Sequence, residues 1–162
     1  MQKILFISGM LLTVIANGAQ AKDQKFIDFA LEQAHSAGFK RCDAAIKAVF
    51  ELAGGEDMRI DVRWKDETKK DSFEINSVYG SNGDSVYINS RYRFHANKCF
   101  MNKTTILTSS KSCVAYANET NAFKFNAEIL DYSWFKNDGG VPMHLKPLNG
   151  GCIAIFHGDG TY

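Results

Sequence analysis

Several features that would reveal a biochemical activity are missing from this sequence. Only two prolines and no low-complexity run occur in 162 residues, which excludes collagen-like and proline-rich modules. The HExxH, P-loop and GxSxG patterns are absent, so there is no common metalloprotease, nucleotide-binding or serine-hydrolase signature. No repeat with a period of about 20–50 residues is visible, which argues against solenoids and propellers.

An excess of charge of either sign is also missing. The chain has 19 basic and 18 acidic residues and a formal net charge of +1. A protein that coats nucleic acid would show a basic excess, so we expect no nucleic-acid partner. The hydrophobic share of 45% and the charged share of 23% are typical of globular proteins, and the length suits a single core.

Residues 1–21 have the pattern of a secretory signal peptide. Lys3 supplies the positive start, residues 4–15 are mostly apolar, and Ala19 and Ala21 offer the small side chains that cleavage requires. The apolar run is too short to cross a bilayer, which takes about 20 residues, and no second stretch of that length follows. We therefore expect a periplasmic or secreted mature chain, residues 22–162, that forms a single α+β domain without a membrane span.

The cysteines fit this location, because all four lie after the predicted cleavage site. They are Cys42, Cys99, Cys113 and Cys152. An even number of cysteines in an exported protein predicts two disulfides, with three possible pairings. The first guess joins Cys99 to Cys113 across an expected hairpin and leaves Cys42 for Cys152. No CxxC pair occurs, so we expect no zinc site, no other metal and no cofactor.

The hydrophobic period divides the mature chain into a helical part and a strand part. Residues 22–55 show the 3.6-residue spacing of two amphipathic helices, and the period then changes to two. Strands are expected over residues 58–65, 73–79, 86–94, 99–108, 114–117, 123–135 and 153–156. A loop is expected over residues 142–151 and a loose tail over 157–162. Helices followed by strands predict an α+β fold, with two N-terminal helices packed on a curved antiparallel sheet of five to seven strands.

The polar sides of two expected strands carry a set of basic and aromatic residues. The set consists of Arg59, Arg63, Tyr87, Arg91, Arg93 and His95. Guanidinium groups bind carboxylates with two hydrogen bonds, so we expect a surface for an anionic partner if these strands are neighbours. The alternative is an ordinary solvated face, balanced by Asp61 and Glu74.

The expected loop at residues 142–151 is the second candidate for binding. It carries Met143 and His144 beside leucines, in a region that should be polar. Loops with apolar residues that the core does not need often bind a partner. The alternative is that the segment packs over an open edge of the sheet.

These observations favour a small exported protein, stabilised by disulfides, that binds another protein or a cell-envelope component and performs no chemistry. An inhibitor, an immunity protein or an adaptor would act in this way. One alternative is a secreted hydrolase acting on peptide or glycan, with a catalytic group from His95, Glu128, His144 or Cys152. Another is a carrier of a small apolar ligand, held in a cavity between helices and sheet.

Overall fold

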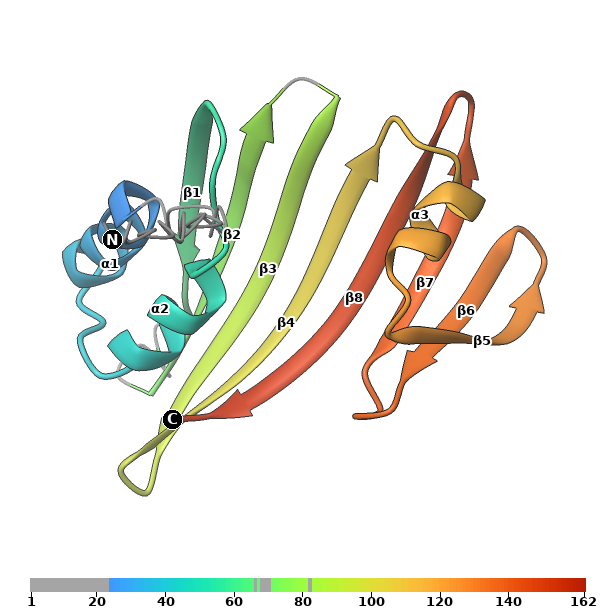
Figure 1. Ribbon diagram of the computed structural model, residues 1–162. Helices are drawn as coiled ribbons and strands as arrows, with labels where there is room; N and C mark the ends of the chain where they lie inside the picture. The colour runs from blue at the N-terminus through green and yellow to red at the C-terminus, as the bar shows by residue number, and fades with distance from the viewer. Residues whose placement is uncertain (1–23, 66, 68–70, 82) are drawn as a thin grey trace, which may run out of the picture.

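A computed structural model describes residues 24–65, 67, 71–81 and 83–162. The predicted signal peptide lies outside the described residues. The described chain forms three helices and one eight-stranded antiparallel sheet (Figure 1). The helices are α1 (Gln24–Ser36), α2 (Asp43–Phe50) and α3 (Cys113–Glu119). The strands are β1 (Asp57–Arg63), β2 (Ser72–Ser81), β3 (Asp84–His95), β4 (Lys98–Ser109), β5 (Phe123–Ile129), β6 (Tyr132–Asn137), β7 (Pro142–Leu148) and β8 (Gly151–Thr161).

All three helices lie on one face of the sheet, which we call the helix-covered face (Figure 1). Under α1 and α2, the side chains of Ile46, Phe50 and Tyr92 are at most 1% exposed and fill the space between helices and sheet. Under α3, a smaller cluster is built on Met143 and Leu145. We call the opposite side of the sheet the open face, because no helix in the described part of the chain covers it.

The two halves of the sheet repeat one arrangement, although no repeat is visible in the sequence. The strand order β1-β2-β3-β4-β8-β7-β6-β5 places two four-stranded meanders edge to edge, each preceded by helix. When the two halves are aligned by a constant difference in residue number, the disulfide cysteine Cys99 of the first half corresponds to Cys152 of the second. The same alignment maps Thr104 of β4 onto His157 of β8, and these two residues face each other where the halves meet. The halves are therefore related by an approximate two-fold axis at this pair.

The two predicted disulfides are present, but the first guess of their pairing is wrong. Cys42 bonds to Cys99, and Cys113 bonds to Cys152. Cys99 lies near one end of β4, a strand of 12 residues, and Cys113 follows the other end. At about 3.3 Å per residue, an extended strand of that length holds the two cysteines far beyond disulfide reach. In each half, the bond instead joins the start of a helix to the start of the central strand.

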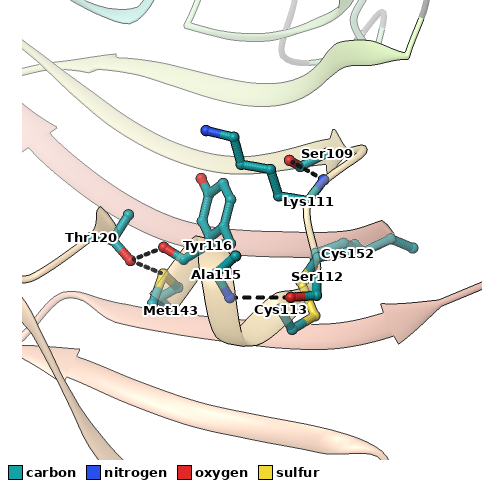
Figure 2. The surroundings of a disulfide bond; sticks show 10 residues. Ser109, Lys111, Ser112, Cys113, Ala115, Tyr116, Thr120, Met143 and Cys152 are labelled. Atoms are coloured by element: carbon teal, nitrogen blue, oxygen red, sulfur yellow. Dashed lines mark hydrogen bonds between the residues drawn. A yellow bond between two sulfur atoms is a disulfide. The ribbon is translucent and has the colours of Figure 1, made fainter. Parts of the chain in front are cut away.

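The segment that we expected as a short strand at 114–117 is the helix α3 (Figure 2). Its first turn is capped by Ser112, whose Oγ accepts a hydrogen bond from the Ala115 amide at 3.2 Å. Such a cap satisfies an amide that has no partner within the helix. No residue of α3 is fully buried, although Tyr116 and Ala117 pack against the cluster beneath the helix. We infer that the disulfide from Cys113 to β8 is its main attachment to the sheet.

The second half of the sheet has more strands than the sequence predicted. The expected single strand over 123–135 is a hairpin of β5 and β6, which turns at Leu130 with a positive φ of 57° and no glycine to signal it. The expected loop over 142–151 contains β7, in which Met143 and Leu145 point to the core. The expected loose tail is part of β8, held by the Tyr162 amide on the Cys99 carbonyl oxygen at 2.9 Å.

The α+β class is thus confirmed, with two corrections. The sheet has eight strands rather than five to seven. The helices are not confined to the N-terminal end, because α3 follows β4. Both corrections come from the second half of the chain, where the β5–β6 turn lacks glycine, β7 contains both prolines and the period-two signal is short.

Candidate functional site

The open face is built by strict alternation along the first strands. In β1, the side chains of Met58, Ile60 and Val62 pack against the core, so those of Arg59 and Arg63 point the other way. The antiparallel register continues this division from strand to strand, because paired residues share a face. Polar residues of successive strands therefore line up in rows across the open face.

The structure brings the first predicted set of residues onto this one face. Arg59, Arg63, Tyr87, Arg91, Arg93 and His95 all lie on the open face, on β1 and β3. The prediction required the two strands to be direct neighbours. In the structure they are not, because β2 lies between them. Polar residues of β2 fill this interval, and Glu74 and Asn76 make hydrogen bonds to the β3 side.

A hollow of about 970 Å³ lies on the part of the open face that carries most of this set. Its lining includes Arg63, Glu74, Arg91, Arg93, His95 and Phe100. We call it the arginine hollow. Three guanidinium groups, an imidazole and an exposed phenyl ring around one concave surface suit an anionic group with an attached apolar part.

Glu74 of β2 organises this hollow. Its Oε2 accepts from Arg91 Nε at 2.9 Å, and its Oε1 accepts from Asn89 Nδ2 at 2.6 Å and Asn76 Nδ2 at 3.1 Å. Tyr87 donates its hydroxyl to Asn76 Oδ1 at 2.8 Å, which extends the network. Burial alone would raise the pKa of Glu74, but the hydrogen bonds from Asn76, Asn89 and Arg91 outweigh it and lower the pKa. The carboxylate is therefore charged at neutral pH and fixes Arg91 in place.

Among the residues that the structure describes, two of the three arginines in the hollow have a carboxylate partner and the third does not. Arg63 Nε lies 2.6 Å from Asp61 Oδ2, and Arg91 is held by Glu74. Arg93 makes no ion pair with the residues that the structure describes. A cation without a partner at the rim of a hollow can bind an incoming anion without first breaking an internal contact.

A second, smaller hollow of about 400 Å³ adjoins the first and shares Arg91 and Asn102 with it. It lies over the centre of the sheet, where Thr104 Oγ1 and His157 Nδ1 are 3.1 Å apart. Together the two hollows extend from the first half of the sheet to the line where the halves meet.

The second predicted pair, Met143 and His144, is divided between the two faces. Met143 is fully buried in the core, so only His144 lies on the open face. The centroid of its ring lies 4.1 Å from that of Trp134 and 5.7 Å from that of His157. Burial and, to a smaller extent, the charge of His157 lower the pKa of His144. Its Nε2 is buried without a hydrogen-bond partner among the described residues.

The residues suggested for hydrolysis are not assembled into a catalytic group. Cys152 is in a disulfide and has no thiolate to offer. Glu128 points to the helix-covered side, whereas His95 and His144 lie on the open face in different halves. In the described part of the chain, no hydrogen bond joins any two of the four.

The described residues also hold no cluster of three or more histidine, cysteine, aspartate or glutamate side chains that could bind a metal ion. Among those same residues, no helix is long and apolar enough to cross a membrane. Side chains fill the core under α1 and α2, and the two hollows found beside the helices have volumes of only about 170 and 250 Å³. The described residues therefore give little support to the ligand-carrier alternative.

Sequence reasoning missed residues that β2, β3, β4 and β8 contribute to the open face. The most important are Glu74, Asn76, Asn89, Phe100, Asn102, Thr104 and His157. The sequence presents Glu74 as a balancing charge or as one of several carboxylates on expected strands, and His157 as a candidate base for Cys152 or as part of a loose tail. The parity of residue numbers across the tight β2–β3 and β3–β4 turns is the available signal for the first six, since it places them on the side of Arg91.

Comparison with known proteins found no matching family model, no matching characterised protein and no matching solved structure, so the candidate site is assigned from its own geometry.

Proposed function

We propose that this chain is an exported, disulfide-stabilised binding protein that holds an anionic partner, a protein or a cell-envelope component, against the open face of its sheet. No chemical step on the partner belongs to this function. The observation that carries the proposal is the arginine hollow, in which Arg63, Arg91 and Arg93 surround one concave surface beside Phe100.

The distribution of charge over the molecule supports an anionic partner. The strand positions of the open face carry eight basic side chains (Arg59, Arg63, Arg91, Arg93, Lys98, Lys124, Lys136, Lys146) and four acidic ones (Asp57, Asp61, Glu74, Asp159). The whole chain has a net charge of only +1, so the rest of the molecule is acidic on balance. A basic face on a nearly neutral protein attracts and orients an acidic partner.

The export part of the proposal rests on two independent features. Residues 1–21 have the composition of a signal peptide, and both disulfides would be reduced in an ordinary cytosol. Disulfides are also a common way to stabilise small exported domains, which have limited hydrophobic cores.

The test is a quantitative binding experiment with a matched control. The purified protein is used to isolate its partner from the cell-envelope fraction of the source organism, and the purified partner is then titrated against three forms. These are the wild type, the double variant Arg91→Ala/Arg93→Ala on the open face, and the double variant Lys40→Ala/Lys47→Ala on the helix side. Both variants lose two positive charges from exposed positions.

We expect the arginine variant to bind roughly tenfold more weakly or worse, because paired guanidinium contacts are among the stronger polar contacts at interfaces. The lysine variant should keep the wild-type affinity, and added salt should weaken wild-type binding. Equal affinities of the two variants would show that the open face is not the site. Turnover of the partner into a product would show that the protein is an enzyme.

A further inference from the structure

A row of apolar side chains crosses the open face beside the arginine hollow. The register aligns one residue from each strand, and six of these eight residues are apolar or aromatic. They are Val78, Tyr87, Ile106, Ile155, Trp134 and Ala127. Val78, Tyr87 and Trp134 are 49%, 36% and 39% exposed, and no helix of the described chain covers them. We call this line the apolar row.

The apolar row is too long and too continuous to be scattered surface residues. Eight strands at about 4.8 Å spacing give a row roughly 34 Å long. Five rows of the open face, about 6.8 Å apart, give a surface of roughly 900 Å², which is comparable to the roughly 800 Å² that each partner contributes to a standard protein interface. An uncovered apolar line inside a surface of this size is typical of a protein-binding face.

The charges beside the apolar row identify the chemistry of the partner. At its β1 end the row finishes on Arg59, and the next two rows toward the arginine hollow contain Arg63, Arg91 and the network around Glu74. A flat membrane surface would bury this polar network together with the apolar residues, which is costly. A second copy of the chain would place one basic face on another, so self-association through this face is disfavoured.

We propose that the open face docks an acidic protein partner whose apolar side chains lie on the apolar row while its carboxylates enter the arginine hollow. This inference rests on the proposed function and deepens it, because it selects a protein partner and adds the apolar row to the contact. The burial of Val78 and Trp134 supplies affinity, and the arginines set the orientation of the partner.

The experiment uses a displayed library of random peptides as the probe, panned against the purified oxidised protein. The selected peptides are titrated against the wild type, against Val78→Ser/Trp134→Ser on the apolar row, and against Leu52→Ser/Val114→Ser on the helix side. The control removes two apolar side chains that are at least as exposed as the first pair, at 90% and 73%. The arginine variant of the preceding experiment is titrated as a fourth form.

We expect the selected peptides to combine aspartate or glutamate with aliphatic or aromatic residues. Their affinity should fall roughly tenfold or more in the apolar-row variant and remain unchanged in the helix-side control. If one double variant does not fold, Trp134→Ser alone is compared with Leu52→Ser alone.

Peptides that depend on the arginines but not on Val78 or Trp134 would overturn this inference and leave the proposed function standing. A selection without binders, or binders indifferent to both sets of residues, would overturn this inference, while the proposed function would be decided by the titration of the isolated envelope partner. A concentration-dependent dimer of the wild type that the apolar-row variant abolishes would identify the occupant as a second copy and would also overturn the inference.

Discussion

The two disulfides occupy equivalent places in the two halves, yet the helices that they attach differ, and this difference gives a sharp prediction. The perturbation removes one bond at a time, with Cys42→Ala/Cys99→Ala in the first half and Cys113→Ala/Cys152→Ala in the second. Alanine suits these positions because three of the four cysteines are at most 3% exposed and a hydroxyl there would lack a partner.

The expected loss of stability follows from the loops that the bonds close. The sequence separations are 57 and 39 residues. In the loop-entropy model, these lengths correspond to about 4.2 and about 3.9 kcal/mol, so the two variants should be destabilised almost equally. The pairing of Cys99 with Cys113 would instead give one short and one long loop, worth about 3 and about 5 kcal/mol.

The local consequences of the two removals should differ strongly. Helix α2 buries four residues, including Ile46 and Phe50, which are fully inaccessible, so it should stay docked without its disulfide. Helix α3 has seven residues and buries none of them, so it should detach from β8 when Cys113 and Cys152 are replaced. A helix of this length is not stable without tertiary contacts.

Urea unfolding of the oxidised proteins measures the global effect, and amide hydrogen exchange measures the local one. We expect similar free-energy losses, with rapid exchange over α3 in the second variant and retained protection over α2 in the first. Retained protection of α3 after removal of its bond would refute the claim that the disulfide is its main anchor. A peptide map that links Cys99 to Cys113, or four free thiols in the exported protein, would refute the pairing itself.

Three further predictions concern single side chains. The pKa of His144 is lowered in the folded state, so the unfolded chain binds a proton at a higher pH than the folded chain does. The free energy of unfolding should therefore fall as the pH drops below about 6.5. In urea titrations, His144→Gln should remove this dependence. The pKa of Glu74 is also lowered, so its stabilising contribution should be present above its ordinary pKa of about 4.5 and be lost as the pH falls through the folded value. Glu74→Gln should flatten that part of the acid-unfolding curve. Phe50→Ala, which opens a cavity at a fully buried site, should cost about 3–5 kcal/mol, measured by urea unfolding against wild type at pH 7.

The first half of the fold could be read from the sequence because each element there has a strong local signal. The 3.6-residue spacing of apolar residues predicts one buried face on each of the two helices. Ala30 of α1 and Ile46 and Phe50 of α2 lie on these faces, and all three are fully buried. The alternation from Met58 to Arg63 predicts β1 correctly. The turn chemistry around Gly83 separates β2 from β3 as expected, because the left-handed conformation found there favours glycine.

The second half could not be read in this way because its local signals are weak or misleading. Leu130 adopts a positive φ that leucine rarely takes, so no residue type marks the turn between β5 and β6. Pro142 begins β7, a strand position where the missing amide hydrogen is tolerated, although two prolines in a short segment suggested a loop. Helix α3 is too short for an apolar period to show.

The sequence alone determined the α+β class, the presence of two disulfides and the set of basic and aromatic residues on the polar sides of the strands, because each depends on composition or local spacing. Only the tertiary structure decided which cysteines pair, and that Glu74 of β2 holds Arg91 of β3. It also decided that apolar residues of all eight strands except β1 and β7 fall into one row. The cysteine pairing and the full apolar row depend on how strands distant in the chain, such as β4 and β8, lie against each other, and the packing of the core sets that arrangement. The contact of Glu74 with Arg91 lies within one hairpin, but its side-chain geometry is not fixed by residue spacing.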